Sequence, residues 1–230
     1  MPLPGTNAAV AIVLAAGDGS RLGSREPKAF LEVEGVPMLV HAVRAASGSG
    51  LFERIVVTVP PGSEALGREL LEGLPTPVDV IAGGRSRQGS VDAGLSVVPP
   101  AVEVVLCHDA ARPFASPALF VAVAEALNGA DGAIPVLAPS DTVKRVRDGI
   151  VVSTEPREEI GLAQTPQAFS AAALREAHER AAAAELEFTD DAAALEWAGY
   201  RVRVIEGDPE NVKITTAADL ARAAGRHRAG

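Results

Sequence analysis

The sequence predicts an α/β protein with a doubly wound, mostly parallel sheet and a projecting β-hairpin arm. Short apolar runs rich in β-branched residues recur along the chain, and helical segments separate them. Runs that are apolar throughout, rather than alternating, are typical of strands covered by helices on both faces. Strands and helices in this order form right-handed crossovers and therefore a parallel sheet. The alternation stops after Pro139, where the arm is predicted.

The regular part of the fold is predicted from nine segments. The apolar runs predict strands at residues 10–14, 54–59, 78–82, 103–107 and 132–136. The segments between them begin at Pro or Ser and some end at Gly, as helix caps require. These segments predict helices at residues 37–46, 63–73, 86–98 and 116–129. In such folds, ligands bind at the carboxyl ends of the strands.

The segment 141–158 predicts the arm. Its Asp148-Gly149 pair lies between β-favouring residues, which is typical of a tight hairpin whose two turn residues have positive φ. Because an isolated two-stranded hairpin is only marginally stable in water, we expect the arm to pack against another surface, such as a second subunit. Two helices, a strand and a last short helix follow, at 170–185, 190–199, 200–207 and from Thr216.

Length and composition limit the function. A chain of 230 residues with 47% hydrophobic residues can form one substantial core, so we predict a single domain, 1–230, with 140–160 as an arm for dimerisation. The net charge of −9 without a clustered positive field argues against a general nucleic-acid binder. The longest apolar stretch is about nine residues, against about 20 needed to cross a bilayer. With Cys107 as the single cysteine, we expect a cytoplasmic protein.

A glycine-rich turn, residues 15–30, follows the first strand directly. Glycine lacks a Cβ and accepts positive φ, so backbone N–H groups of such a turn can approach phosphate oxygens. The turn also carries Arg21, Arg25 and Lys28, which would balance the charge of a phosphate. We therefore predict a phosphate-binding loop, with an ordinary glycine-rich turn as the structural alternative.

Two familiar glycine motifs do not fit this turn. A P-loop requires Gly-Lys followed by Ser or Thr, and the turn contains no Gly-Lys pair. A dinucleotide fingerprint requires G-x-G-x-x-G, whereas Gly17, Gly19 and Gly23 are spaced G-x-G-x-x-x-G. The sequence therefore disfavours both classes.

The turn, AAGDGSRLGSREPKAF, resembles the signature of sugar-phosphate nucleotidyltransferases. Five further motifs follow in order: HDAARPF from His108, SDTVKRV from Ser140, AQTPQAF from Ala163, FTDDAAALE from Phe188 and EGDPENVKIT from Glu206. Together the motifs cover nearly the whole chain and are similar to the 2-C-methyl-D-erythritol 4-phosphate cytidylyltransferase family of the non-mevalonate isoprenoid pathway. The resemblance implies a Rossmann-like nucleotidyltransferase fold. It also implies an enzyme that uses CTP and Mg²⁺ to form 4-CDP-2-C-methyl-D-erythritol and pyrophosphate.

The resemblance implies that the glycine-rich turn holds the triphosphate of CTP. Four of its residues would lie at the nucleotide: Ala15, Ala16, Gly17 and Gly19. Arg21 and Lys28 would be catalytic, because they would stabilise charge on the reacting phosphate. No strong general base is needed, since a phosphate monoester with a second pKa near 6 is already largely dianionic at pH 7. Catalysis would then depend on positioning, these cations and a Mg²⁺ that bridges the phosphates.

The segment AGGRSRQGS is similar to the part of the family that reads cytosine. Backbone groups of Gly83 and Gly84 and the hydroxyl of Ser90 would contact the base. Arg85 follows Gly84, where family members often carry an acidic residue, so any side-chain contribution to base reading would differ here. The structural alternative is a glycine turn followed by a serine helix cap.

Asp109 and Arg112 follow the strand that ends at Cys107. The resemblance implies that Asp109 orients the ribose or substrate hydroxyls and stands near Mg²⁺, and that Arg112 supports the loop or a phosphate of the nucleotide. The alternative is that Asp109 caps a turn and pairs with Arg112. We interpret His108 as structural, because no partnered nucleophile is near it in sequence, and Cys107 as a small buried side chain.

The resemblance also implies a sugar-phosphate site shared between two subunits. Thr142 and Arg157, on the arm, would contact the substrate phosphate in the neighbouring active site, together with Thr165, Thr189 and Lys213. The alternatives are a solvated surface hairpin, a helix N-cap for Thr189 and a strand-edge charge for Lys213. The resemblance thus implies a homodimer whose ligands are CTP and a sugar-alcohol phosphate. The charge distribution and the short apolar stretches argue against nucleic acid or a membrane as a partner.

Two other functions remain to be separated from this one. A ribitol 5-phosphate cytidylyltransferase resembles the same loop and HDA-x-RP motifs, and physical argument from one sequence does not distinguish the two sugars. A catalytically silent nucleotide-binding protein is the alternative from another class. Four charged residues that the reaction would use argue against it: Arg21, Lys28, Asp109 and Lys213.

Overall fold

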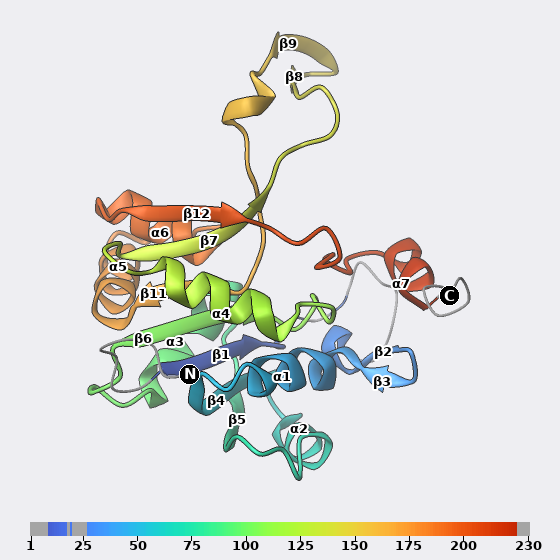
Figure 1. Cartoon of the computed structure of the whole chain (residues 1–230), viewed down its shortest axis with the longest axis vertical. Coiled ribbons are helices and arrows are strands. Elements are labelled where there is room, and N and C mark those ends of the chain that lie inside the picture. The colour runs from blue at the N-terminus through green and yellow to red at the C-terminus, as the bar shows by residue number, and fades with distance from the viewer. Residues whose placement is uncertain (1–8, 18, 20–26, 225–230) are drawn as a thin grey trace.

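A mixed sheet forms the centre of the computed structural model, which describes residues 9–17, 19 and 27–224 (Figure 1). The strands run in the order β10 (Leu162–Ala163), β7 (Gly132–Leu137), β11 (Gln167–Ser170), β6 (Val104–Asp109), β1 (Ala9–Leu14), β4 (Phe52–Val59) and β5 (Val78–Ala82), with β12 (Val202–Glu206) also paired to β7. Strands β10 and β11 are antiparallel to their neighbours and the other pairs are parallel. The predicted α/β class with a mostly parallel sheet is therefore confirmed.

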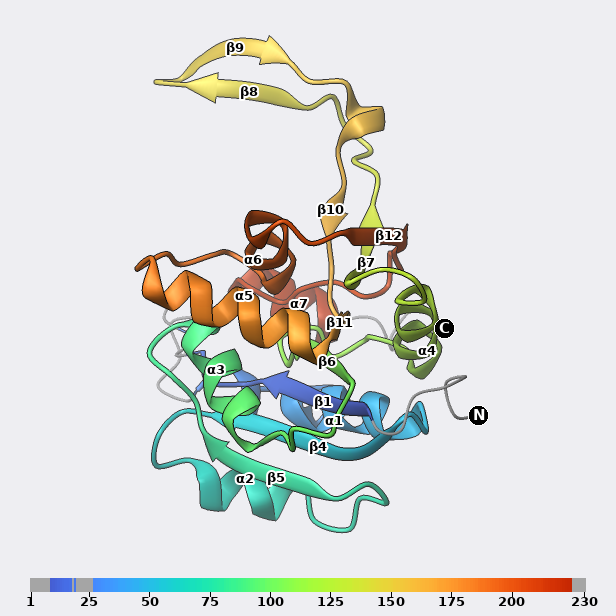
Figure 2. The same cartoon turned by 90° about the vertical axis from the view of Figure 1, so that its left-hand side faces the viewer.

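Both faces of the sheet are covered by helices, and β1 shows why. Its alternate residues enter two separate cores: Ala11 and Val13 point to one face, Val10 and Ile12 to the other, and all four are fully buried. The first core includes residues of α1 (Met38–Gly48) and α4 (Pro117–Ala126), and the second includes residues of α3 (Arg87–Val97), α5 (Ala171–Ala183) and α6 (Asp191–Ala198). Figure 2 shows α3 and α5 in front of the sheet and α1 behind β1.

Side-chain caps set where three of these helices begin. Ser86 accepts a hydrogen bond from the N–H of Gly89 at the start of α3, and Ser116 caps α4, with Pro117 in its first turn. The Oδ1 atom of Asp190 accepts from the N–H of Ala193 at the start of α6. These caps satisfy N–H groups that have no partner within the helix.

The remaining elements lie at the edges. They are the short hairpin β2 (Glu32–Val33) and β3 (Val36–Pro37), helices α2 (Glu64–Leu70) and α7 (Ala217–Ala224), and the 3₁₀ helices η2 (Lys28–Phe30) and η3 (Arg157–Glu159). Every helix among the described residues is too short or too polar to cross a bilayer. The expected burial of Cys107 is confirmed, since its side chain is fully enclosed in β6.

The arm consists of β8 (Lys144–Arg147) and β9 (Ile150–Thr154), which stand away from the body of the molecule (Figure 2). Asp148 has φ +50° and Gly149 has φ +76°, which confirms the predicted turn. The arm leaves four large apolar side chains exposed: Val146, Ile150, Val151 and Val152. Within one chain, nothing among the described residues covers this surface.

Candidate active site

The largest concentration of predicted site residues lies in a pocket of about 400 Å³ at the carboxyl ends of β1, β5 and β6. This is the place expected for a ligand in a doubly wound sheet. Among the described residues, the lining has four cationic side chains and a single carboxylate: Lys28, Arg85, Arg87, Lys213 and Asp109. The excess of positive charge suits an anion with several negative charges.

The turn after β1 forms one wall of this pocket. The lining contains every described residue of the turn that was predicted to bind nucleotide or act in catalysis: Ala15, Ala16, Gly17, Gly19 and Lys28. Gly19 has φ +72°, and a Cβ at this position would lie 3.1 Å from both N and Cβ of Lys28. Only glycine therefore lets the chain pass so close to the lysine. Arg21 and Arg25 lie outside the described residues.

The turn after β5 also lines this pocket and is tied to the first turn of α3. The N–H of Gly84 donates to Oγ of Ser90 (3.2 Å), and that hydroxyl donates to the carbonyl of Ser86 (2.9 Å). Gly84 and Ser90 line the pocket, whereas Gly83 packs behind them, where an added Cβ would lie 2.4 Å from Cβ of Ala16. The hydroxyl of Ser90 thus already holds the turn in place.

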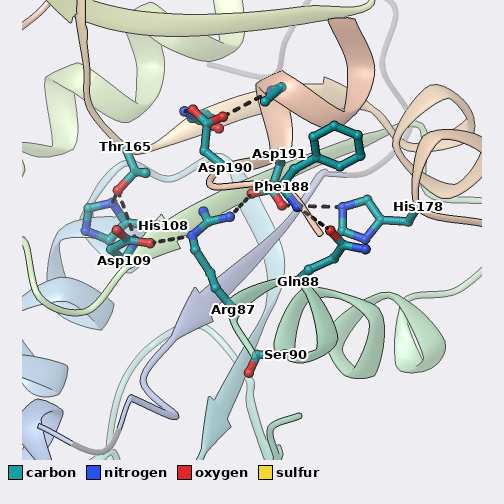
Figure 3. Close-up of polar contacts among 12 residues, drawn as sticks. Arg87, Gln88, Ser90, His108, Asp109, Thr165, His178, Phe188, Asp190 and Asp191 are labelled. Carbon is teal, nitrogen blue, oxygen red and sulfur yellow. Dashed lines mark hydrogen bonds and ion pairs between the residues drawn. The ribbon is translucent and has the colours of Figure 1, made fainter. Parts of the chain in front are cut away.

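Asp109, at the end of β6, lies between two cations. Its Oδ1 is 3.2 Å from Nε of Arg87 (Figure 3). Its Oδ2 is 2.6 Å from Nζ of Lys213. Burial alone would raise the pKa of Asp109, but Arg87 and Lys213 together hold it well below its usual range. Asp109 is therefore a carboxylate at neutral pH, and it pairs with these two cations rather than with Arg112.

Arg87 is a site residue that the sequence reasoning missed. It is the first residue of α3, where the positive end of the helix dipole disfavours a cation. That unfavourable position was the available signal that the residue serves another purpose. Burial opposes its charge, yet the carboxylates of Asp191 and Asp109 raise the pKa of the guanidinium above its ordinary value.

A smaller pocket of about 200 Å³ adjoins the first and shares three of its lining residues, Arg87, Asp109 and Lys213. The other lining residues include Arg112, Thr165, Thr189 and Asp190. The structure thus brings together four of the six residues predicted to bind the sugar phosphate: Asp109, Thr165, Thr189 and Lys213. Arg112 lines this smaller pocket and not the larger one.

Hydrogen bonds fix the end of β6 (Figure 3). Oγ1 of Thr165 accepts from the N–H of Asp109 (3.0 Å) and donates to Nδ1 of His108 (3.1 Å). Nε2 of His108 then donates to the carbonyl of Arg112 (3.3 Å). Burial lowers the pKa of His108 to about 4, so this fully enclosed ring is neutral near pH 7. The interpretation of His108 as structural is confirmed.

Arg112 and Asp190 stabilise the loops around the smaller pocket. The guanidinium of Arg112 donates to the carbonyls of Asn211 (2.8 Å) and Ala163 (3.1 Å). Asp190, rather than Thr189, caps α6, and its second oxygen accepts from Nε2 of Gln167 (2.9 Å). The N-cap alternative for Thr189 is therefore wrong. The loop-supporting role considered for Arg112 is confirmed.

Among the described residues, Thr142 and Arg157 are predicted site residues that lie away from both pockets of their own chain, whereas Gly83 only packs behind the lining. Both belong to the segment that carries the arm, and neither lines the pocket of 400 Å³ or that of 200 Å³. Arg157 donates to the carbonyl of Ser140 (3.4 Å) and lies 3.6 Å from Glu158, with its side chain 57% exposed.

The described residues contain no group of three or more His, Cys, Asp or Glu side chains that could hold a metal ion by themselves. Asp109 supplies one carboxylate to the larger pocket, and both of its oxygens already face cations. Mg²⁺ is commonly bound by one or two carboxylates together with substrate phosphates. This donor set fits a Mg²⁺ only if phosphate oxygens of a ligand supply most of its coordination.

Comparisons with known proteins agree on one family. The family model for 2-C-methyl-D-erythritol 4-phosphate cytidylyltransferase matches residues 9–226. The protein of that name from Rhodococcus opacus is 47% identical over 94% of this chain and 93% of its own length. The one from Streptomyces avermitilis is 41% identical over 95% of this chain and 91% of its own length. The structure of 4-diphosphocytidyl-2C-methyl-D-erythritol synthase from Anaerococcus prevotii superposes with a TM-score of 0.86 at 30% identity, covering 96% of this chain and 98% of that one. The structure of 2-C-methyl-D-erythritol 4-phosphate cytidylyltransferase from Thermus thermophilus superposes with a TM-score of 0.79 at 35% identity. The superposition covers 96% of this chain and 99% of that one.

Proposed function

The chain belongs to the 2-C-methyl-D-erythritol 4-phosphate cytidylyltransferase family, and from this premise we propose how its two pockets perform the reaction. The enzyme transfers the cytidylyl group of CTP to 2-C-methyl-D-erythritol 4-phosphate, forming 4-CDP-2-C-methyl-D-erythritol and pyrophosphate. The relatives carry this name over nearly the full chain, so the ribitol 5-phosphate alternative is not favoured. The observation that carries the proposal is the cation-rich pocket at the end of β1.

We assign CTP to the pocket of 400 Å³. Its triphosphate would follow the turn 15–30, where glycine residues admit phosphate oxygens close to the backbone and Lys28 faces the pocket. We retain Arg21 with Lys28 as the second catalytic cation. Charge that accumulates on the α-phosphate and the leaving pyrophosphate would be stabilised by these two cations.

We assign methylerythritol phosphate to the pocket of 200 Å³, with Thr165, Thr189 and Lys213 around its phosphate. Lys213 lines both pockets, so its ammonium would lie between two substrates that are both anions. An oxygen of the dianionic phosphate attacks the α-phosphorus, the bond to pyrophosphate breaks, and no protein base is required. This agrees with a neutral, buried His108, whose two ring nitrogens are already bonded to Thr165 and to the carbonyl of Arg112.

For the base, we assign recognition to the turn that contains Gly83 and Gly84. The N–H of Gly83 donates to Val59 and that of Gly84 donates to Ser90, so cytosine would meet the carbonyl groups of this turn. The hydroxyl of Ser90 would then act by holding the turn or by re-forming its hydrogen bond with the base. Arg85 lines the pocket as a fourth cation.

We propose that Asp109 would hold a Mg²⁺ as the carboxylate of the described pocket lining, together with phosphate oxygens of CTP. Bound there, the ion would withdraw electron density from the α-phosphate and neutralise the departing pyrophosphate. The protein residues do the remaining work: Lys213 and Arg87 orient Asp109, and Lys28 contacts the nucleotide.

We propose that the working enzyme is a homodimer in which each arm completes the partner's active site. The support is the exposed apolar surface of the arm, since a two-stranded hairpin is marginal alone, together with the distance of Thr142 and Arg157 from the pockets of their own chain. The guanidinium of Arg157 suits bidentate binding of a terminal phosphate. The single buried cysteine is in keeping with the cytoplasm, where we place the enzyme.

The proposed function is tested by pyrophosphate release. Purified protein is incubated with Mg²⁺, each of the four nucleoside triphosphates and a panel of sugar-alcohol phosphates. We expect release with CTP and methylerythritol phosphate together and not with either alone. Release with ribitol 5-phosphate in place of methylerythritol phosphate, or with ATP in place of CTP, would contradict the proposed specificity.

A further inference from the structure

Arg87 is held on both sides by carboxylates from different elements (Figure 3). Its Nε lies 3.2 Å from Asp109 at the pocket, while its Nη1 lies 2.9 Å from Oδ2 of Asp191, the first residue of α6. The side chain of Asp191 is only 2% exposed and lines neither the pocket of 400 Å³ nor that of 200 Å³. The guanidinium therefore connects the site to a charge inside the protein.

Asp191 is in turn held by His178 of α5. Nε2 of His178 lies 3.4 Å from Oδ1 of Asp191, and Nδ1 lies 2.5 Å from Oδ1 of Asp92 on α3. Burial disfavours the charged ring, but the carboxylates of Asp191 and Asp92 raise the pKa of His178 to about 9. The buried carboxylate thus has one cation on each oxygen, and helices α3, α5 and α6 meet at this point.

The contacts form a continuous chain of alternating charges. It runs from the surface through the core to the active site in the order Asp92, His178, Asp191, Arg87, Asp109 and Lys213. A buried ion pair adds little net stability compared with apolar packing, yet removing one partner leaves the other uncompensated. Each charged side chain in this series is therefore held in one orientation by the charges on either side of it.

Arg87 has a reason to need such a constraint. Its long side chain starts at the positive end of α3 and lines the pocket assigned to a triphosphate. Without a fixed partner behind it, the guanidinium would be drawn to ligand phosphates, because a bidentate pair with phosphate is strong. The contact with Asp191 keeps Nε directed at Asp109.

We propose that Asp191 and His178 are positioning residues of the cytidylyl transfer site. They hold Arg87 so that Asp109 remains oriented toward Lys213, where the two substrates meet. The inference rests on the proposed function of Asp109 and Lys213, and it gives the buried charges of α5 and α6 a role in catalysis although they touch no substrate.

A double-mutant cycle tests whether Asp191 acts through Arg87. Asp191→Asn keeps the shape and removes the charge, and we expect it to lower kcat about tenfold, as for a modest displacement of a catalytic group. In the Arg87→Ala background, the same change should alter kcat by less than about twofold. An equal loss in both backgrounds, or a full rate for Arg87→Ala alone, would overturn the inference.

Two further variants separate a loss of positioning from a loss of folding. Glu176→Gln removes the contacts of Glu176 with Arg180 and Tyr200, on the same helix as His178 but outside the charge chain, and should keep the wild-type kcat. If Asp191→Asn does not fold, His178→Gln replaces it in the cycle, with an expected loss of about threefold that also vanishes in the Arg87→Ala background.

The proposed function and the positioning role of Asp191 are contradicted by different results. A folded wild-type protein that releases no pyrophosphate would contradict the proposed function. Wild-type protein with activity, combined with a wild-type kcat in folded Asp191→Asn, would leave that function intact and contradict only the positioning role.

Discussion

Nζ of Lys213 lies 2.6 Å from Oδ2 of Asp109, although 104 residues separate them in the chain. Lys213 follows β12, whereas Asp109 ends β6, so the contact exists only because the sheet brings both elements to the same edge. It joins the pocket assigned to CTP with the pocket assigned to the sugar phosphate.

Removing the charge of Lys213 should lower the rate and raise the pKa of Asp109. In Lys213→Met, Asp109 loses one of the two cations that hold its pKa below the usual range, so its pKa rises. We expect kcat to fall about a hundredfold, and carbon-13 NMR of the labelled Asp109 carboxyl group should show the higher pKa. Lys213→Arg retains the charge and should leave the pKa of Asp109 low. An unchanged pKa in Lys213→Met would contradict the pairing of Asp109 with Lys213.

Lys28→Ala should lower kcat by at least about a hundredfold, because it removes a fixed charge from the pocket that binds the reacting phosphate. The thermal midpoint should stay close to wild type. Arg54→Ala provides a control, since this cation lies on β4 and pairs with Asp79 in an exposed position outside both pockets. A near-wild-type rate for Lys28→Ala would remove it from the catalytic residues.

Arg157→Ala should weaken binding of the sugar phosphate far more than binding of CTP. We expect KM for the sugar phosphate to rise about tenfold or more, because a charge-assisted contact is lost. Steady-state kinetics with each substrate varied in turn measures the two constants separately. Equal losses for both substrates would contradict the division of the site.

The same variant tests whether the arm crosses between subunits. A heterodimer of Arg157→Ala and Lys28→Ala chains contains one site with an intact Lys28 and an intact Arg157 donated by the other chain. Mixing two weakly active proteins should therefore restore activity. No recovery in heterodimers verified by mass would show that the arm does not complete the partner's site.

His178→Gln should change how stability depends on pH. The pKa of His178 is raised from 6.5 to about 9 in the folded protein, so its charged form contributes stability that is complete below about pH 6.5 and is lost as pH rises through about 9. The groups that face the ring are Asp92 from α3 and Asp191 from α6, with Arg87 beyond Asp191.

We expect the thermal midpoint of the wild type to fall between pH 7 and 9.5 by roughly 3 °C more than that of His178→Gln. Calorimetry at a series of pH values measures this difference. Glu176→Gln, on the same helix, should follow the wild type. Parallel curves for wild type and His178→Gln would show that the ring is not charged in the folded protein.

Local patterns were sufficient for most of the fold. Continuous apolar runs, capping residues and the Asp148-Gly149 pair predicted the order of strands and helices and the arm, because each depends on residues close together in sequence. Strands β10 and β11 were missed. They are two and four residues long and are separated by a segment that contains Pro166, so periodicity could not reveal them, and their antiparallel pairing depends on the neighbours β6 and β7.

The sequence by itself determined that a glycine-rich turn with Lys28 follows a buried strand, and the order of its motifs indicated the family. Only the tertiary structure decided which charges meet: Asp109 with Lys213, and Arg87 between Asp109 and Asp191. It also decided that Asp190 caps α6. The physical reason is that a turn or a cap depends on a few adjacent residues, whereas an ion pair in a buried site depends on how the sheet and helices place distant residues side by side.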